Sequence, residues 1–439
     1  MNVGHGWVFS PDEDVESVLL RLYQKFPPLL PGDLSRPLRF YQKLGNPQNH
    51  LPPVFHVAGT NGKGSVLAFL QAVFEAAELS VHKYISPHLT RFEERITVNG
   101  ALVPKDILLN LIVQGESAAG DEPLSFFEFF TGLAFLAFAR TPADVVLLET
   151  GLGGRLDATN VVAHPEASII TRISHDHNRL LGDTLADIAC EKAGIMRENV
   201  PVIIGPQKDI SVMRVFEEKA REVGAKIYKG FSISIQEKKF LYSGENMHFS
   251  LPYPRLLGRH QIDNAATAIA AIEKSSFSEL KNEDILARAM QTVSWPGRLQ
   301  RLSVGPLVSL LPTGWELWLD GAHNDSGAEA LAEQISLWGA DKPLHLLTAF
   351  KQGKDIASFY GPLRHGVATI TAVEANIQAP MLSAEKLRQS LVDIGYDNPA
   401  FAENLESAVR GLIFTSSRPG RILVTGSLYL VGLVLRTHT

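Results

Sequence analysis

The sequence predicts an α/β protein of two domains: a larger P-loop domain with a mostly parallel, doubly wound sheet, and a smaller Rossmann-like domain. Three observations lead to this prediction. Short apolar runs typical of buried strands alternate with helical patterns along most of the 439 residues. A strand, a glycine-rich loop and a helix follow one another directly near residue 60. The alternation stops at Trp295-Pro296-Gly297-Arg298 and then restarts, which predicts domains at 1–297 and 298–439.

Composition narrows the classes of function. With 45% hydrophobic and 20% charged residues, the chain has the composition of an ordinary globular protein. A net charge of -6 and no long basic run argue against nucleic-acid binding. The apolar runs 126–138 and 422–435 are shorter than the roughly 20 residues that span a bilayer. The single Cys190 and the polar N-terminal stretch favour a cytoplasmic protein that acts on small molecules.

The first part of the chain leads to a phosphate-binding loop. We predict helices over 14–26 and 38–44, a buried strand over 51–57 and a helix over 65–77. The loop between strand and helix contains Gly59, Thr60, Asn61, Gly62, Lys63, Gly64 and Ser65. Its glycines let backbone N–H groups converge, while the helix start and Lys63 add positive charge, an arrangement suited to a polyphosphate. Because Val57 and Gly64 depart from the standard phosphate-loop pattern, a tight turn without a ligand is the alternative.

The segments that follow place polar residues at strand ends. We predict strands over 81–85 and 144–148, helices over 104–117 and 126–139, and an irregular loop over 86–96. In a parallel sheet the carboxyl ends of the strands lie at one edge, so the loop should lie near the phosphate loop. Glu149 follows its strand directly and precedes several glycines. A carboxylate in that position favours a bound cation, since burial without one is costly.

A third strand end carries two histidines and an aspartate. The strand covers 167–171, His175-Asp176-His177 follow it, and a helix that contains Lys192 begins near residue 183. These side chains could hold a divalent ion, although histidines in such a place are more often ordinary loop residues. Lys192 could be a solvated helix lysine. We then predict an antiparallel meander over 232–251 and helices over 262–274, with Asn264 near its start, and 283–292.

Beyond the predicted boundary the alternation of strands and helices restarts. The predicted strands cover 316–319, 344–349, 368–373 and 421–424. The predicted helices cover 326–338, 356–360, 384–394 and 405–414. This order predicts the second, smaller doubly wound sheet.

Further motifs occur along the chain in a definite order. They are Ser86-Pro87-His88-Leu89, Glu94-Arg95-Ile96, Glu149-Thr150-Gly151-Leu152-Gly153-Gly154-Arg155-Leu156-Asp157-Ala158-Thr159-Asn160, Asp176-His177, Glu191-Lys192-Ala193-Gly194-Ile195, Gly258-Arg259-His260-Gln261, Pro296-Gly297-Arg298, Asp320-Gly321-Ala322-His323-Asn324 and Gly426-Ser427-Leu428-Tyr429-Leu430-Val431-Gly432. Together with the glycine-rich loop they resemble the folylpolyglutamate synthase/dihydrofolate synthase family, of the bifunctional bacterial type, in the Mur ligase superfamily.

The resemblance implies an ATP-dependent ligase. Such an enzyme joins L-glutamate to dihydropteroate, forming dihydrofolate, and to the glutamate tail of reduced folates. A carboxylate is a poor electrophile, so its oxygen first takes the γ-phosphoryl group of ATP, and the glutamate amine then displaces phosphate from the acyl phosphate. Mg²⁺ neutralises charge between ATP and the attacking carboxylate. The resemblance further implies a monomer, a site in a cleft between the domains, and a monovalent cation such as K⁺.

The resemblance also implies roles for individual residues. The catalytic set would be Lys63, Glu149, His177, Lys192 and His323. The loop residues 59–65 would hold the phosphates, together with Asn264, Arg298 and Asp320. Ser86, Glu149 and His177 would bind Mg²⁺, and Ser125, Phe127 and Asp157 would contact the pterin. Lys192 matches a lysine that is carbamylated in the family. A carbamate can bind Mg²⁺ through its oxygens, whereas an ammonium group would repel it.

Three departures from the family pattern stand out. His82-Lys83-Tyr84-Ile85 occupy a stretch where the family often has a glycine and a hydrophobic residue, Ser174-His175 precede Asp176, and Asp325 replaces a proline. None removes a reacting group. The alternatives are an enzyme with only one of the two activities, a Mur-type ligase for a cell-wall nucleotide, and a nucleotide-binding module without catalysis.

Overall fold

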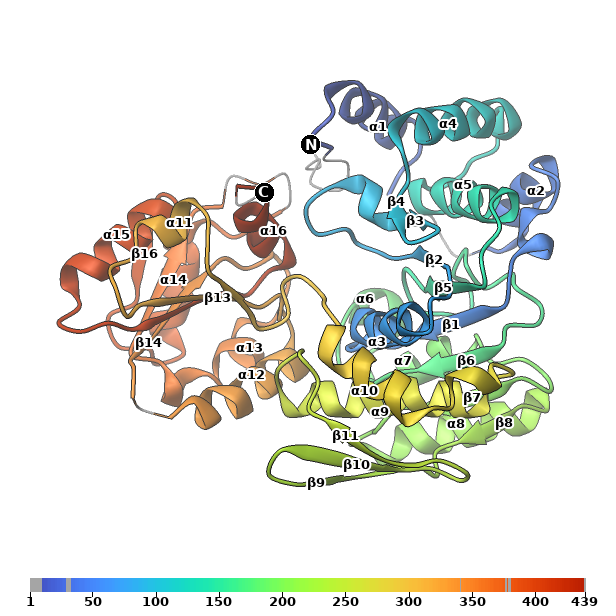
Figure 1. Cartoon of the computed structure of the whole chain (residues 1–439). Coiled ribbons are helices and arrows are strands. Elements are labelled where there is room, and N and C mark those ends of the chain that lie inside the picture. The colour runs from blue at the N-terminus through green and yellow to red at the C-terminus, as the bar shows by residue number, and fades with distance from the viewer. Residues whose placement is uncertain (1–9, 29–32, 340, 376, 378–379, 438–439) are drawn as a thin grey trace. The chain divides into compact units, whose positions relative to one another are not determined.

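The structure, a computed structural model, describes residues 10–28, 33–339, 341–375, 377 and 380–437. The described chain divides into two compact α/β units (Figure 1). The large unit contains Ser10–Arg255 and Gln261–Ser294, and the small unit contains 256–260 and 295–437. The predicted fold class is confirmed. No sequence pattern indicated that the short segment 256–260 groups with the small unit.

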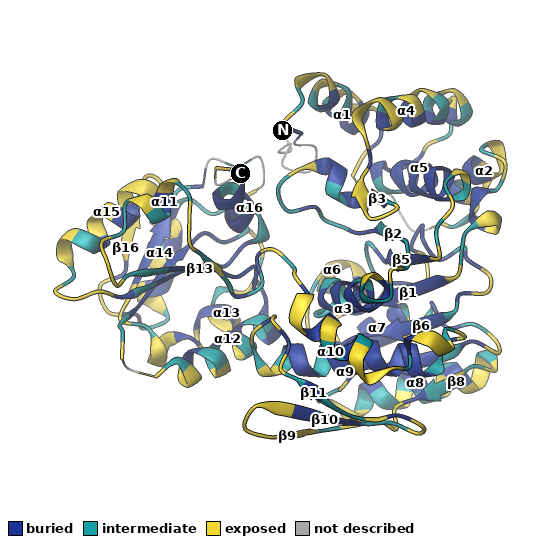
Figure 2. Cartoon of the chain, in the orientation of Figure 1, coloured by how far each residue is buried: buried dark blue, intermediate teal, exposed yellow. Residues whose placement is uncertain are grey.

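The large unit is built on one eight-stranded sheet with the order β4-β3-β2-β5-β1-β6-β7-β8. Its strands are β1 (Val54–Ala58), β2 (Val81–Tyr84), β3 (Ile96–Val98), β4 (Ala101–Leu102), β5 (Val145–Glu149), β6 (Ala167–Ile170), β7 (Pro201–Ile204) and β8 (Lys226–Tyr228). All neighbours from β2 to β8 pair in parallel, and only β3 and β4 join antiparallel. The central strands are buried along their whole length (Figure 2), which explains their continuous apolar sequences.

Helices cover both faces of this sheet. They are α1 (Glu13–Lys25), α2 (Ser35–Lys43), α3 (Lys63–Ala76), α4 (Lys105–Ala119), α5 (Phe126–Arg140), α6 (Asn178–Leu181), α7 (Leu185–Ala193), α8 (Ile210–Val223), α9 (Arg259–Lys274) and α10 (Glu283–Thr292). On one face Phe74 of α3 packs edge-on against Phe55 of β1, with 5.7 Å between ring centroids. On the other face Phe138 of α5 stacks on His82 of β2 at 4.9 Å.

The predicted meander is confirmed as a three-stranded antiparallel sheet of β9 (Ser232–Ile235), β10 (Lys239–Ser243) and β11 (His248–Pro252). Glu273 of α9 connects it to the rest of the large unit. Its buried carboxylate accepts hydrogen bonds of 2.7 Å from the hydroxyls of Tyr228 and Tyr242, and one of 2.6 Å from the backbone N–H of Asn246. These bonds satisfy a charge that burial would otherwise make costly.

The small unit is built on a six-stranded sheet with the order β12-β13-β17-β14-β15-β16. Only β12 is antiparallel to its neighbour. The strands are β12 (Gln300–Leu302), β13 (Glu316–Leu319), β14 (Leu344–Thr348), β15 (Thr369–Val373), β16 (Ala400–Ala402) and β17 (Arg421–Thr425). The helices are α11 (Pro306–Ser309), α12 (Asp325–Trp338), α13 (Ile356–Tyr360), α14 (Ala384–Asp393), α15 (Leu405–Thr415) and α16 (Leu428–Arg436).

The structure differs from the sequence-based expectations in several short elements. The segment predicted as an irregular loop contains a 3₁₀ helix, η2 (Phe92–Arg95), and leads directly into β3. The strands β12 and β16 and the helices α6 and α11 were not predicted. Elements of three or four residues are too short to show a period. No described helix is both long and apolar enough to cross a membrane.

The stability of the small unit should depend on Glu316 in β13. Its carboxylate lies 2.7 Å from Lys342 Nζ and 3.1 Å from Arg421 Nε. Burial alone would raise the pKa of Glu316, but hydrogen bonds from Lys342, Trp318 and Arg421 lower it to about 2. A carboxyl group with a depressed pKa contributes stability above its unfolded pKa, and this contribution disappears as the pH falls toward the folded value.

We therefore expect Glu316→Gln to lower the free energy of unfolding by on the order of 2 kcal/mol at pH 7 and by less at pH 4. Urea unfolding followed by the fluorescence of Trp315, Trp318 and Trp338 measures this difference. Glu385→Gln, which removes an exposed ion pair with Arg388, should change little. A loss that is equal at both pH values would contradict the prediction.

Candidate active site

The glycine-rich loop between β1 and α3 approaches two other segments closely. Gly59 and Gly62 have φ values of 148° and 96°. A Cβ atom would lie 1.8 Å from Thr171 Oγ1 if added to Gly59, and 2.5 Å from Asn264 Oδ1 if added to Gly62. Both positions therefore require glycine for their backbone conformation and for space. The loop is packed between the end of β6 and the first turns of α9, which brings the predicted Asn264 to it.

Backbone hydrogen bonds hold this loop against the segment after β6. The N–H groups of Thr60 and Asn61 donate to the carbonyl oxygen of Arg172 at 3.0 and 3.2 Å. The Thr60 hydroxyl donates to the Ser174 carbonyl oxygen at 3.1 Å. The segment that carries His175, Asp176 and His177 is thus connected to the phosphate loop. No pattern in the sequence indicates these contacts.

Lys63 and Glu149 form the centre of the candidate site. Lys63 Nζ lies 3.7 Å from Glu149 Oε1 and donates to the carbonyl oxygen of Gly59 at 3.1 Å. Glu149 is the last residue of β5, pairs in register with Val57 of β1, and is 6% exposed. The parallel register brings a buried carboxylate to the loop lysine. Such a carboxylate needs a cation beside it.

Ser86 lies next to the same carboxylate. Its backbone N–H donates to Glu149 Oε2 at 3.2 Å. The loop after Ser86 is fixed by Glu94, whose carboxylate accepts the hydroxyl proton of Thr90 and three successive backbone N–H groups at 2.7, 3.0 and 3.1 Å. In the sequence, Glu94 stands out only as part of the motif Glu94-Arg95-Ile96. Its structural role is to hold the loop that carries Ser86.

His177 is the residue directly before α6 and has a left-handed conformation, with a φ of 55°. Its Nε2 lies 3.9 Å from Asp176 Oδ1, and its side chain is about half exposed. Among the described residues no three His, Cys, Asp or Glu side chains form a group that could hold a metal. The predicted magnesium ligands include only two such side chains, Glu149 and His177. Glu149 is the one carboxylate among them, and Mg²⁺ usually takes one or two carboxylates and completes its shell with water and phosphate oxygens.

Lys192 of α7 is a buried residue and not the solvated helix lysine that the sequence left open. It is 5% exposed. Burial and the charge of Lys63 lower the pKa of Lys192 to about 7, while Asp176 and Asp157 act in the opposite direction. The amine is therefore partly neutral at pH 7 and mostly neutral at pH 8. A neutral amine is a nucleophile, which an ordinary lysine at this pH is not.

The glycines after Glu149 allow the chain to lie directly on α7. A Cβ added to Gly154 would be 2.7 Å from the carbonyl oxygen of Glu191 and 3.0 Å from Lys192 Cα. Arg155 strengthens this contact, because its backbone N–H donates to the Glu191 carbonyl at 2.7 Å and its guanidinium pairs with the Glu191 carboxylate at 2.8 Å. These contacts determine where Lys192 lies.

The three residues predicted to contact the pterin, Ser125, Phe127 and Asp157, lie in different surroundings. The Ser125 hydroxyl accepts the backbone N–H of Glu128 at 3.2 Å and caps α5. Phe127 is half-buried, and its ring would be 2.5 Å from a Cβ added to Gly151. The flat ring of Phe127 therefore lies against the glycine segment, the stretch 151–154 that follows Glu149.

Asp157 is buried within its own loop. It accepts the backbone N–H of Leu152 at 2.8 Å and the hydroxyl of Thr159 at 2.5 Å. Thr159 in turn lies 2.9 Å from Nε2 of His56 on β1. Because the Thr159 proton goes to Asp157, the bond to Thr159 is donated by His56. The chain of hydrogen bonds ties the glycine segment to the strand that leads into the phosphate loop.

Three predicted residues lie together in the small unit, at the carboxyl end of β13. Asp320 is buried and accepts the backbone N–H of Leu299 at 2.9 Å. Burial raises the pKa of Asp320, and the nearby Arg298 opposes this shift. The ring of His323 is oriented by a 2.8 Å contact between Nδ1 and the Gly321 carbonyl oxygen. Arg298, Asp320 and His323 thus form one group within the small unit.

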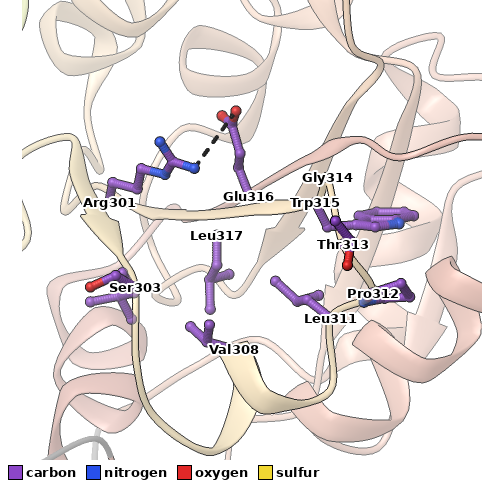
Figure 3. A pocket seen from close by; sticks show the side chains of 11 residues that line it. Arg301, Ser303, Val308, Leu311, Pro312, Thr313, Gly314, Trp315, Glu316 and Leu317 are labelled. Atoms are coloured by element: carbon purple, nitrogen blue, oxygen red, sulfur yellow. Dashed lines mark ion pairs between the residues drawn. The ribbon is translucent and has the colours of Figure 1, made fainter.

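A cavity of about 250 Å³ lies elsewhere in the small unit, beside β12, β13 and α11 (Figure 3). Arg301 and Glu316 lie at its edge, 4.0 Å apart, and Val308, Leu311 and Leu317 line its apolar part. None of the predicted site residues lines it. The candidate site therefore rests on the residues at the strand ends.

Two models of known protein families match the chain. Residues 57–272 match the Mur ligase middle domain, and residues 308–437 match the dihydrofolate synthetase C-terminal domain. The chain is 32% identical to the dihydrofolate synthetase of Saccharomyces cerevisiae, an alignment that covers 92% of this chain and 97% of that protein.

Solved structures are also similar to this chain over nearly its whole length. The structure of E. coli FolC in complex with DHPP and ADP is 30% identical, with a TM-score of 0.84 over 95% of this chain and 96% of that one. A bifunctional folylpolyglutamate synthase/dihydrofolate synthase from Yersinia pestis, complexed with AMPPNP and Mn ion, is 30% identical, with a TM-score of 0.83 over 95% and 97%. The chain therefore belongs to the dihydrofolate synthase/folylpolyglutamate synthase family of Mur ligases.

Proposed function

We propose that this enzyme uses ATP and Mg²⁺ to join L-glutamate to dihydropteroate and to the glutamate tail of tetrahydrofolates. The observation that carries the proposal is the buried carboxylate of Glu149, held between Lys63 and the N–H of Ser86 beside the glycine-rich loop. The names of the relatives support the substrates, since one structure holds DHPP and ADP and another holds AMPPNP and Mn. We also expect a cytoplasmic monomer that uses K⁺, as the sequence predicted.

In this proposal the large unit binds the triphosphate. The N–H groups of residues 62–65 at the start of α3 point along the helix axis, and Lys63 adds a full positive charge, so both would hold the β- and γ-phosphates. Ser86, Glu149 and His177 would hold Mg²⁺, which supplies neutralisation of phosphate charge when it is bound. Before nucleotide binds, the ion pair with Glu149 would hold the ammonium group of Lys63 beside the loop.

We further propose that Lys192 is carbamylated. Its neutral amine would attack CO₂, forming an N–C bond and releasing one proton, and the product would carry a negative charge. That charge would be attracted to Lys63, which otherwise repels the lysine ammonium. The burial that lowers the pKa of Lys192 would also protect the carbamate from water.

The proposal also gives roles to three residues of the small unit. Arg298 would reach the nucleotide phosphates, and Asp320 and His323 would face the nucleotide or the incoming glutamate. The 2.8 Å contact of His323 Nδ1 with a backbone carbonyl supports such a role, because it fixes the tautomer and leaves Nε2 as the other functional nitrogen. The pterin would lie against Phe127.

Substrate assays test the function directly. With ATP and glutamate, we expect phosphate release both with dihydropteroate and with tetrahydrofolate, because the family includes enzymes named for each product. A UDP-muramoyl peptide should give none. Release with only one pterin substrate would show a monofunctional enzyme, and release with neither would refute the proposal.

The role of Glu149 is tested by Glu149→Gln, which keeps the shape of the side chain and removes its charge. We expect kcat to fall about 100-fold or more, because the metal loses an anionic oxygen ligand. Asp144→Asn is the matched control, since this exposed carboxylate lies just before the opposite end of the same strand. Near-normal turnover of Glu149→Gln would rule out the metal role.

Carbamylation of Lys192 gives a prediction about pH and CO₂. The amine is neutral above its pKa of about 7, so activity should rise from pH 6 to pH 8 and fall when CO₂ is removed. After incubation with ¹³C-bicarbonate, NMR should show a carbamate carbon that Lys192→Met lacks. Full activity without CO₂, together with no such signal, would contradict the modification.

A further inference from the structure

A second lysine lies on the same face of the sheet as Glu149. Lys83 of β2 pairs in register with Leu147 of β5, and Glu149 follows two residues later. Residues two apart in a strand point to the same face, so Lys83 and Glu149 share one. His82 and Tyr84 point to the opposite face, where they contact Phe138 and Thr131 of α5.

The side chain of Lys83 is held by α3, the helix that begins with Lys63. Lys83 Nζ donates to Gln71 Oε1 at 2.7 Å, and Gln71 Nε2 donates to Glu75 Oε1 at 2.7 Å. The two bonds fix the orientation of the Gln71 amide, so its oxygen faces the ammonium group. The ammonium group of Lys83 is therefore held in one place against α3, unlike that of a mobile surface lysine.

The charge of Lys83 acts on two carboxylates of the site. Burial lowers the pKa of Lys83, and the carboxylates of Glu75, Glu94 and Glu149 each oppose this shift. Glu94 holds the loop of Ser86, and Glu149 is the proposed metal ligand. Lys83 is thus within electrostatic range of both acidic groups.

We propose that Lys83 is a positioning residue for the nucleotide: its charge, held by Gln71, offsets Glu94 and Glu149 and favours the anionic Mg-nucleotide over a free cation. The inference rests on the proposed nucleotide site at Lys63 and Glu149. A positive charge near the site attracts the doubly negative Mg-nucleotide complex and repels a divalent cation that enters alone. Removing it must therefore change the two affinities in opposite directions.

The test compares Lys83→Met with the wild type. We expect the Kd of Mg-AMPPNP, measured by calorimetry, to rise about 3- to 10-fold, and the Kd of Mn²⁺ for the nucleotide-free enzyme, measured by electron paramagnetic resonance, to fall by a similar factor. Both changes should shrink at high salt, and Lys83→Arg should restore both constants. A purely structural role would weaken both affinities together, or leave both unchanged with a lower Tm, and either result would overturn the inference.

Two controls separate this inference from the proposed function. Lys226→Met, at an exposed position on β8 at the far edge of the same sheet, should leave both constants unchanged. If the wild type does not bind Mg-AMPPNP, the proposed function fails. If the wild type binds it and Lys83→Met behaves like the wild type, only the role of Lys83 is refuted.

Discussion

The interaction on which the candidate site depends is the pairing of a buried carboxylate with the lysine of the phosphate loop. Glu149 is 6% exposed and lies 3.7 Å from Lys63 Nζ. An unpaired carboxylate in this place would be costly to bury, so the end of β5 and the start of α3 cannot move apart without a large loss of free energy. The parallel register of β1 and β5 keeps the two segments together, and the segment at Ser86 is positioned by the same carboxylate.

Around this pair, close approaches and hydrogen bonds of the backbone hold the segments of the site together. Gly59 and Gly62 let the loop approach Thr171 and Asn264, and hydrogen bonds to Arg172 connect it to the end of β6. Four strands of one parallel sheet, β1, β2, β5 and β6, therefore contribute to one edge. This is the edge at which doubly wound sheets bind ligands, because loops from several strands meet there.

Burial and local contacts determine the charge state and the position of the lysines near the phosphate loop. Lys192 has a pKa near neutrality because it is buried near Lys63, and Lys83 carries a half-buried charge held by Gln71. Three lysines and several carboxylates thus share the neighbourhood of the phosphate loop, and hydrogen bonds fix the amines of Lys63 and Lys83. A site of this kind can bind a highly charged nucleotide and a divalent cation, since charges of both signs are already fixed before either arrives.

The sequence alone determined the fold class, most of the longer elements and the positions of the motif residues. Elements such as 316–319 and 356–360 were predicted with their observed bounds because hydrophobic periodicity is a local property. The meander was found for the same reason, whereas β12, β16, α6 and α11 are too short to carry a period. Only the tertiary structure decided that Gly59 contacts Thr171, that Glu94 fixes the loop of Ser86, that Lys192 is buried, and that Lys83 lies on the same face of the sheet as Glu149. These facts depend on strand order and register between segments far apart in the chain, and a local pattern of residues does not encode either.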